Sequence, residues 1–279
     1  MIYHVTYLSD GFKVKGYLGL PPEYIFQSSG VSELVRRCFA HTDAHLPVSL
    51  TACSIRSGTD IAGAKLPAFL YCRGGIGKVG MVKQNWVEQF AGLGYVVFAP
   101  SYRGNEGGEG RDEFGGAEQQ DVRAAYDLLR SLPFVDSERI SVMGFSRGAI
   151  NAAKAAAEIE GIHKLILWGG VSDLVKTYEE RVDLRRMLKR VIGGTPSNNP
   201  EAYKARSPLY WADRIRCPVL IVHGTVDQQV DISHGERMYD RLLQLGRDVS
   251  MHRYEGYGHH MALQVHEAAV ERMVDWLKT

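Results

Sequence analysis

The sequence predicts an α/β protein whose mostly parallel, doubly wound sheet is covered by helices on both faces. Two patterns carry this prediction. From about residue 65, short apolar runs alternate with longer stretches of helical spacing. Some of the short runs, such as YVVFAP (95–100), are apolar throughout, which is typical of strands buried on both faces. Regular strand–helix alternation favours a parallel sheet, because the crossover helices pack on its faces.

The predicted elements follow one another in a regular order. We expect strands in PAFLYCRGG (67–75), YVVFAP (95–100), RISVMGF (139–145), KLILWGG (164–170), PVLIVHG (218–224) and DVSMHRYEG (248–256). We expect helices in VKQNWVEQFAGLG (82–94), from about 117 to 132, in AINAAKAAAEIE (149–160), in ISHGERMYDRLLQLG (232–246) and at 262–277. Gly94 and Gly246 stand where helices end, and Pro218 can occupy the first position of its strand.

Two segments break this rhythm. Residues 21–64 form an irregular N-terminal insertion, in which VSELVRRCF (31–39) predicts a short helix. Residues 172–211 form a helical excursion between two strands, which we interpret as a small lid. The 279 residues are enough for one domain with a substantial core, so we expect a single domain over 1–279.

Composition excludes several classes of function. A net charge of +1 gives no electrostatic reason to expect binding to nucleic acid or to an anionic membrane. No apolar run is long enough to span a bilayer, and the first residues lack the pattern of a signal peptide. We therefore expect a cytoplasmic protein that acts on small molecules, and the sequence leaves a homo-oligomer open.

The cysteines and one histidine-rich stretch are candidates for cross-links or metal ligands. Cys38, Cys53, Cys72 and Cys217 have no C-x-x-C spacing, so we expect reduced thiols, with a Cys38–Cys53 disulfide as the weaker alternative. The stretch HTDAH (41–45) lacks a glutamate-centred zinc motif. We expect neither a metal nor another cofactor.

The strongest local signal is GFSRG (144–148), a G-x-S-x-G pattern that lies between a predicted strand and a predicted helix. This is the setting of a nucleophile elbow, in which two glycines allow a sharp turn and the serine projects above the sheet. A bare structural turn is the alternative. The context favours Ser146 as a nucleophile.

A serine needs a histidine base, and the histidine needs a carboxylate that orients it. Asp227 follows the strand PVLIVHG, and His259 follows the next strand, so both stand where parallel strands end. Asp231 is the weaker candidate for the acid, because it looks like the start of a helix. His260 is the weaker candidate for the base, and His223 at a strand end looks structural.

The predicted oxyanion hole needs two backbone donors. The first is the N–H group of Arg147, directly after the serine. The second is expected in the loop YCRGGIG (71–77), where Gly75 lets the backbone approach a substrate closely. A plain glycine turn is the alternative for this loop.

Taken together, these motifs resemble those of the catalytic domain of the prolyl oligopeptidase family, within the α/β-hydrolase fold. FLYCRGG, GYVVFAPSYRGNEGGEG, GGAEQQDV, RISVMGFSRGA, PVLIVHGTVD and YGHH follow the order and spacing of that family over about three quarters of the chain. The chain is particularly similar to short bacillus-type members named hydrolases or esterases. The resemblance implies that Ser146, Asp227 and His259 form a catalytic triad.

The chain also departs from that family's pattern. Arg73 stands where many members have histidine or tyrosine before the paired glycines, which removes a hydroxyl donor and favours the Gly75 N–H group. About 65 residues before the catalytic region cannot form the β-propeller of the large members. Neither the acidic loop NEGGEGRDE nor the pair Glu179-Glu180 clearly matches the glutamates with which aminopeptidase members hold an amino terminus. We interpret them as a solvated loop and a lid-helix face.

These patterns predict a serine hydrolase that forms an acyl-enzyme without a cofactor. We favour a carboxylesterase acting on small acyl esters, because the propeller that helps to hold an extended peptide elsewhere is missing. The alternative is a serine peptidase acting on short peptides or aminoacyl amides. The lid residues Leu184, Met187 and Leu188 either line an acyl pocket or pack on the core.

Overall fold

A computed structural model describes residues 1–39, 44–52 and 58–279 of the chain. By their internal contacts these residues form two compact units. The N-terminal unit comprises residues 1–112, 116–142 and 161–163, and the C-terminal unit comprises residues 113–115, 143–160 and 164–279. The single domain that the sequence predicts over residues 1–279 stays a prediction.

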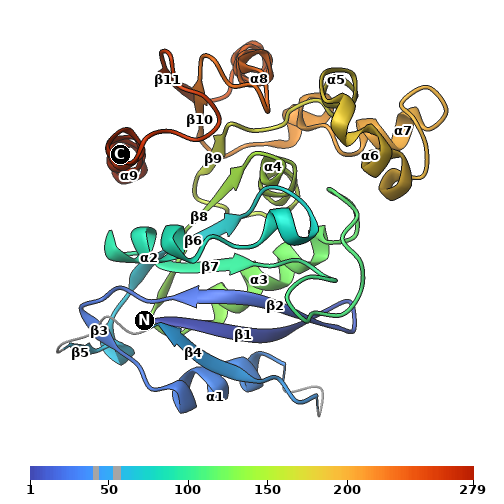
Figure 1. Cartoon of the computed structure of the whole chain (residues 1–279). Coiled ribbons are helices and arrows are strands. Elements are labelled where there is room, and N and C mark those ends of the chain that lie inside the picture. Colours follow the sequence, from blue (N-terminus) through green and yellow to red (C-terminus); the bar gives the residue numbers. More distant parts are fainter. Residues whose placement is uncertain (40–43, 53–57) are drawn as a thin grey trace. The chain divides into compact units, whose positions relative to one another are not determined.

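The N-terminal unit is built on a sheet with the strand order β8-β6-β7-β2-β1-β4. The bounds are β1 (Ile2–Ser9), β2 (Phe12–Gly19), β4 (Val48–Ala52), β6 (Leu66–Cys72), β7 (Val96–Pro100) and β8 (Val135–Phe145). Strands β6 and β7 are parallel, whereas β1 pairs antiparallel with β2 and β4 (Figure 1). Asp10 and Gly11 form the turn of the β1–β2 hairpin, with φ of 49° and 78°, as a tight two-residue connection requires.

In its described residues this unit has three helices, together with two short helical turns and a small second sheet. They are α1 (Ser28–Cys38), α2 (Gln84–Gly92), α3 (Gln119–Ser131), η1 (Ile61–Gly63), η2 (Gly77–Gly80) and the parallel pair β3 (Tyr24–Ile25) with β5 (Thr59–Asp60). The short helix expected in the N-terminal insertion is therefore present as α1. Its apolar face buries Val31 and Val35, whereas Arg36 and Arg37 are exposed.

The C-terminal unit holds the strands from which the predicted triad projects. Its strand order is β11-β10-β9-β8, with β9 (Leu165–Trp168), β10 (Val219–Gly224) and β11 (Val249–Tyr254). Strand β8 ends here, because its residues from Met143 onward belong to this unit. Strand β10 runs parallel to both β9 and β11, and all six of its residues are buried. The predicted parallel sheet is therefore confirmed.

Helices surround this part of the sheet and fill the long connection between β9 and β10. They are α4 (Gly148–Glu158), α5 (Leu174–Glu180), η3 (Val182–Leu184), α6 (Arg185–Ile192), α7 (Pro200–Lys204), η4 (Pro208–Arg214), α8 (Ile232–Gln244) and α9 (Leu263–Lys278). Elements α5 to η4 occupy the segment in which the sequence predicts a helical excursion at 172–211 (Figure 1). Leu188 is fully buried, so this lid residue packs into the unit, whereas Leu184 and Met187 are half-buried.

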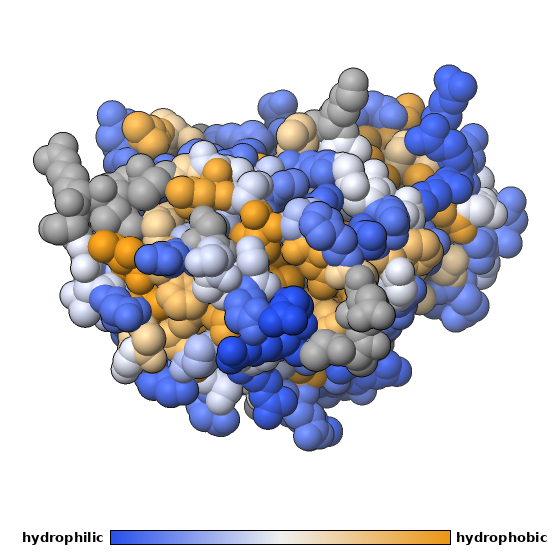
Figure 2. Space-filling model, turned by 90° about the horizontal axis from the view of Figure 1, so that it is seen from below, coloured by the Kyte–Doolittle hydropathy of each residue, from blue (hydrophilic) through white to orange (hydrophobic). Residues whose placement is uncertain are grey.

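Surface features of the described residues add little to the expected class of function. None of the helices in these residues combines the length and apolar character that crossing a bilayer requires. Figure 2 shows hydrophobic side chains in patches between hydrophilic ones on the face viewed from the side of β4 and α1. Cys53 and residues 41–43 lie outside the described residues, and with them the weaker Cys38–Cys53 alternative and most of HTDAH.

Candidate active site

Ser146 occupies a strained turn between β8 and α4. Its φ is 57°, in the left-handed region that a residue with a side chain rarely adopts. Gly144 allows this turn, because a Cβ atom there would lie 2.4 Å from both the Ala149 Cα atom and the Gly148 carbonyl oxygen. A strained conformation at one serine, directly before a helix N-terminus, is the local geometry of a nucleophile elbow.

Strand β9 and the residues after it hold the serine in this conformation. The Ser146 N–H group donates to the carbonyl oxygen of Trp168 at 2.9 Å. The N–H group of Val171 in turn donates to the carbonyl oxygen of Ser146 at 3.1 Å. Both backbone groups of the serine are therefore fixed by a neighbouring segment, which offsets the cost of the strained φ.

Asp227 and His259 meet at the ends of β10 and β11. The Nδ1 atom of His259 lies 2.7 Å from Oδ2 of Asp227, and both side chains are almost completely buried. Oδ1 of Asp227 accepts from the N–H groups of Gln229 at 2.8 Å and Val230 at 3.0 Å. Since a carboxylate oxygen accepts, Nδ1 of His259 carries the proton and Nε2 is left as the basic atom.

The environment keeps Asp227 ionised. Burial by itself would raise the pKa of Asp227, but the hydrogen bonds from His259 and from the N–H groups of Val230 and Gln229 outweigh it. Together they hold the pKa of Asp227 below its usual range. A negative charge therefore faces His259 at neutral pH, and a carboxylate in this position is able to stabilise a protonated imidazole.

The structure separates His259 from the adjacent His260. His259 is buried and hydrogen-bonded to Asp227, whereas the side chain of His260 is exposed. Phe145, the residue before the serine, packs against His259 with ring centroids 4.8 Å apart. Ser146 is thus joined directly in sequence to a residue that contacts the His259 ring, and the three predicted triad residues belong to one unit.

The weaker candidate for the acid has another role. Asp231 is the N-cap of α8, where its carboxylate accepts from the N–H group of Ser233 at 3.0 Å. This is the helix start that the sequence indicates. It leaves Asp227 as the carboxylate that reaches a histidine at the strand ends.

Two glycines that the sequence analysis did not single out make room for the Asp227–His259 pair. Gly169, after β9, has a φ of 51°, and a Cβ atom there would lie 3.2 Å from Nδ1 of His259 and 3.4 Å from Oδ2 of Asp227. At Gly224, the last residue of β10, a Cβ atom would lie 2.3 Å from the Tyr257 carbonyl oxygen. The available signal was a glycine at the end of a buried apolar run, directly after β9 for Gly169 and as the last residue of β10 for Gly224.

Comparison with known proteins identifies the family. The sequence profile described as "Prolyl oligopeptidase family" matches residues 82–279. The "Uncharacterized peptidase YtmA" of Bacillus subtilis is 38% identical over 278 residues, which are 99% of this chain and 93% of that protein. The chain belongs to the prolyl oligopeptidase family. The resemblance inferred from the motifs is therefore confirmed.

More distant members of the prolyl oligopeptidase family are much longer. Dipeptidyl-peptidase 5 of Porphyromonas gingivalis is 28% identical over 77% of this chain and 34% of its own length. The solved acylaminoacyl peptidase of Pyrococcus horikoshii, at 19% identity, matches 99% of this chain with a TM-score of 0.74, and the match covers 41% of that protein. At this identity the likeness shows the fold, which is the predicted α/β-hydrolase fold.

The comparisons also bear on the choice between ester and peptide substrates. YtmA and dipeptidyl-peptidase 5 both carry the word peptidase in their names. What they support directly is a serine hydrolase of the prolyl oligopeptidase family. Between the two finer interpretations of the sequence, they favour the peptidase alternative over the carboxylesterase that the sequence analysis preferred.

The two predicted oxyanion donors lie in different units. Arg147 precedes α4, at the helix N-terminus where N–H groups favour an anion, and its guanidinium packs over the ring of Phe114 at 4.9 Å. Gly75 belongs to the N-terminal unit and has a φ of 63°. Both donors stay predictions.

Arg73, which departs from the family's pattern, stabilises the loop that contains Gly75. Its side chain is 1% exposed, and Nη1 donates to the carbonyl oxygens of Gly74 at 3.1 Å and Gly75 at 3.2 Å. Nη2 donates to the carbonyl oxygen of Ser101 at 2.7 Å and lies 3.3 Å from Oδ2 of Asp112. In place of the family's hydroxyl or imidazole, this chain therefore has a buried guanidinium that binds the loop carbonyls.

The acidic segments that the sequence leaves without a role are bound within their own units. Glu180 on α5 lies 3.2 Å from Nε2 of the buried His234 and also pairs with Lys176. In the loop 105–113, Glu106 accepts from the Tyr17 hydroxyl at 2.9 Å and Glu109 from the Lys13 N–H group at 2.8 Å. These two loop glutamates anchor the loop to β2, so its interpretation as simply solvated is incomplete.

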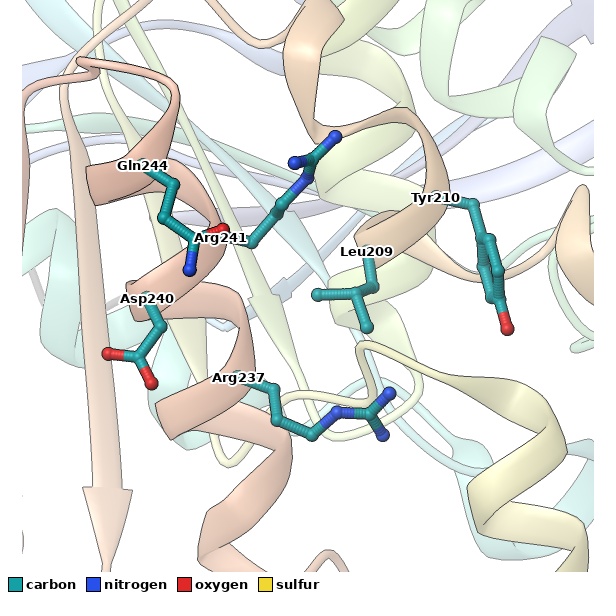
Figure 3. Close-up of a pocket in the computed structure, with 6 residues that line it drawn as sticks. All are labelled: Leu209, Tyr210, Arg237, Asp240, Arg241 and Gln244. Atoms are coloured by element: carbon teal, nitrogen blue, oxygen red, sulfur yellow. The ribbon is translucent and has the colours of Figure 1, made fainter.

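A surface groove on the C-terminal unit lies apart from the triad residues. It has a volume of about 430 Å³ and is lined by Leu209, Tyr210, Arg237, Asp240, Arg241 and Gln244 (Figure 3). Arg237 is already paired with Asp173 at 3.1 Å. Among the described residues, no cluster of histidine, cysteine, aspartate and glutamate side chains has the composition to hold a metal ion.

Proposed function

We propose that this chain is a serine peptidase that cleaves short peptides or aminoacyl amides through Ser146, His259 and Asp227. The observation that carries the proposal is the 2.7 Å contact between His259 Nδ1 and Asp227 Oδ2. This contact lies in the same unit as a serine on a strained elbow, whose preceding residue packs against the His259 ring. A nucleophile, a base and an orienting carboxylate are the groups that acyl transfer requires.

The proposed reaction proceeds through an acyl-enzyme. The Ser146 Oγ atom forms a bond to the substrate carbonyl carbon while its proton passes to Nε2 of His259. Collapse of the tetrahedral intermediate breaks the C–N bond, and the imidazolium gives this proton to the leaving amine. Water then attacks the acyl-serine by the same route and releases the carboxylic acid. N–H groups of Arg147 and Gly75 are the proposed donors to the oxyanion.

The choice of a peptide substrate is supported by the relatives. YtmA, which aligns over almost the whole chain, is named a peptidase, as are the longer relatives. Ester cleavage is an expected second activity, because an alkoxide or phenoxide leaves the same tetrahedral intermediate more readily than an amine does. Activity on activated esters alone would therefore not distinguish an esterase from a peptidase.

The test compares two leaving groups on the same acyl part. Aminoacyl p-nitroanilides are measured beside the matching aminoacyl p-nitrophenyl esters, with acetyl and butyryl p-nitrophenyl esters as a second series. Efficient anilide turnover, with a preference among aminoacyl groups that both leaving groups share, is expected. Turnover of the simple acyl esters with no measurable anilide cleavage would instead establish the carboxylesterase.

Ser146→Ala provides the control for both activities. It should lower kcat/KM more than about 10⁴-fold, because the alanine has no atom that can form the acyl bond. A fluorophosphonate should label the wild-type protein at Ser146 and should not label the variant, as located by peptide mass spectrometry. Retained turnover in a well-folded Ser146→Ala protein would disprove the nucleophile assignment.

A further inference from the structure

A second histidine, His223, lies close to the carboxylate of Asp227. His223 is on β10, one residue before the strand ends, and its side chain is completely buried. It faces α8 at Gly235, where a Cβ atom would lie 2.8 Å from Nδ1 of His223. The sequence indicates only a structural residue here, because a histidine inside an apolar strand gives no sign of what its ring contacts.

The hydrogen bonds of His223 fix its tautomer. Its Nε2 atom lies 2.9 Å from the carbonyl oxygen of Val230, and a carbonyl oxygen can only accept, so Nε2 carries the proton. Nδ1 has no hydrogen-bond partner among the described residues. Burial lowers the pKa of His223, which agrees with a neutral ring. The titratable groups around it are Asp227, His259 and Asp231.

This hydrogen bond closes the turn that presents Asp227. The N–H group of Val230 donates to Oδ1 of Asp227, and the carbonyl oxygen of Val230 accepts from Nε2 of His223. The side chains on either side of Asp227 are exposed, including Val226 at 54%, so these two side chains add little buried contact to the turn. The Nε2–H group of His223 also lies 3.6 Å from Oδ2 of Asp227, the oxygen that faces His259.

We propose that His223 is a positioning residue that sets the orientation of the Asp227 carboxylate through the Val230 carbonyl, so that Oδ2 meets His259. This inference rests on the proposed function of the triad. It assigns a task to a residue that touches neither the substrate nor Ser146. The polarised Nε2–H edge next to Oδ2 additionally favours the ionised carboxylate.

The test separates the hydrogen bond from simple packing. Glutamine carries its amide nitrogen as many bonds from Cα as the Nε2 atom of histidine, so His223→Gln can still donate to Val230. Asparagine is one bond shorter, so His223→Asn is a matched polar variant that cannot reach. His223→Leu fills the volume without a donor. We expect Gln to keep kcat/KM within about threefold, and Asn and Leu to lower it by about 10- to 100-fold.

The pH profile distinguishes a positioning role from a merely structural one. With Asn or Leu, the acid limb of kcat/KM should move to lower pH, because the imidazolium of His259 loses part of the carboxylate's stabilisation. Asp227→Asn is the reference that should move it further. A fall in thermal midpoint with kcat/KM per folded molecule and the acid limb unchanged would overturn the proposal. Equal losses in Gln and Asn would also overturn it.

A readout that needs no substrate keeps this test independent of the proposed function. The proton on His259 Nδ1, shielded from water and bonded to a carboxylate, should give a low-field line in the one-dimensional proton NMR spectrum. The line should be present in the wild type and in His223→Gln. It should move upfield or vanish in His223→Asn and His223→Leu. Lack of fluorophosphonate labelling in the wild type would refute the triad, whereas an unchanged line in all the variants would refute only the role of His223.

Discussion

Two buried carboxylates, one in each unit, are paired with basic side chains of different kinds. In the N-terminal unit, Asp121 is held by three donors of Arg103, namely Nη2 at 2.7 Å, Nε at 3.0 Å and the backbone N–H group at 2.7 Å. In the C-terminal unit, Asp227 meets His259 through one contact of 2.7 Å. Both carboxylates are almost inaccessible to water.

The difference follows from what each base can do with a proton. A guanidinium stays protonated at any pH at which the protein is folded, so Arg103 and Asp121 can only fix the chain. An imidazole exchanges its proton near neutrality, so His259 can take a proton on one nitrogen while the other stays bonded to Asp227. A chain can therefore use buried carboxylates both for stability and for chemistry, and the partner decides which.

Asp227→Asn should produce the largest change, and it tests the chemical half of this comparison. The asparagine oxygen would keep the bonds from Gln229 and Val230, which turns its NH₂ group toward His259. Nδ1 must then accept, so the proton moves to Nε2 and the base is lost. We expect kcat/KM to fall about 10³- to 10⁴-fold, as steady-state assays at pH 7 would show, with little loss of stability. A loss below about tenfold would contradict the assignment of Asp227.

Arg103→Met tests the structural half. It leaves the carboxylate of Asp121 buried without its cation, which should lower the free energy of unfolding by about 3–5 kcal/mol in urea titrations at pH 7. The acid limb of kcat/KM, measured on the folded fraction, should stay in place.

The double variant Arg103→Met, Asp121→Asn is the control for that experiment. It removes both charges and keeps an oxygen that accepts from the backbone N–H group of residue 103. Much of the lost stability should return, because no uncompensated charge remains buried. If the double variant were as unstable as the single one, packing rather than charge would explain the loss.

His252 sharpens the comparison, because it is a buried histidine for which the described residues supply no carboxylate partner. Burial, with a contribution from Arg272, lowers the pKa of His252 to about 4. Since the unfolded chain binds a proton near pH 6.5 and the folded chain does not, stability is full above that pH and falls between 6.5 and 4. When the pH is lowered from 7.5 to 5, the free energy of unfolding of the wild type should therefore fall by about 1–2 kcal/mol more than that of His252→Leu. Urea titrations at both pH values would test this, and parallel stability curves would contradict it.

The sequence predicts the fold well where one pattern decides the structure. The apolar runs that become β7, β9 and β10 are buried throughout, so a local run of apolar residues is enough to predict each of these strands. Boundaries are less predictable. Strand β8 begins at Val135 rather than near Arg139, because it continues through exposed residues that have no apolar signal. Helix α3 begins at Gln119, two residues later than expected.

The candidate site also contains residues that the sequence pattern predicts and residues that it does not predict. Ser146, Asp227 and His259 follow strand ends in the expected order, so spacing alone points to them. The roles of Arg73 and His223 depend on which carbonyl oxygens their side chains reach, and no periodicity encodes that. Gly169 is needed both for its φ of 51° and because a Cβ atom there would lie 3.2 Å from the ring of His259, which comes 90 residues later in the sequence.

The strained conformation of Ser146 makes the serine a reporter of the folded state. Its φ of 57° is maintained by hydrogen bonds to Trp168 and Val171, which form only when β8 and β9 are assembled. In a chain that has lost this arrangement, residue 146 is an ordinary, unreactive hydroxyl. With Ser146 as the proposed nucleophile, fluorophosphonate titration would count intact molecules instead of total protein, and the labelled fraction along a urea gradient would give the survival of this one turn separately from the global unfolding curve.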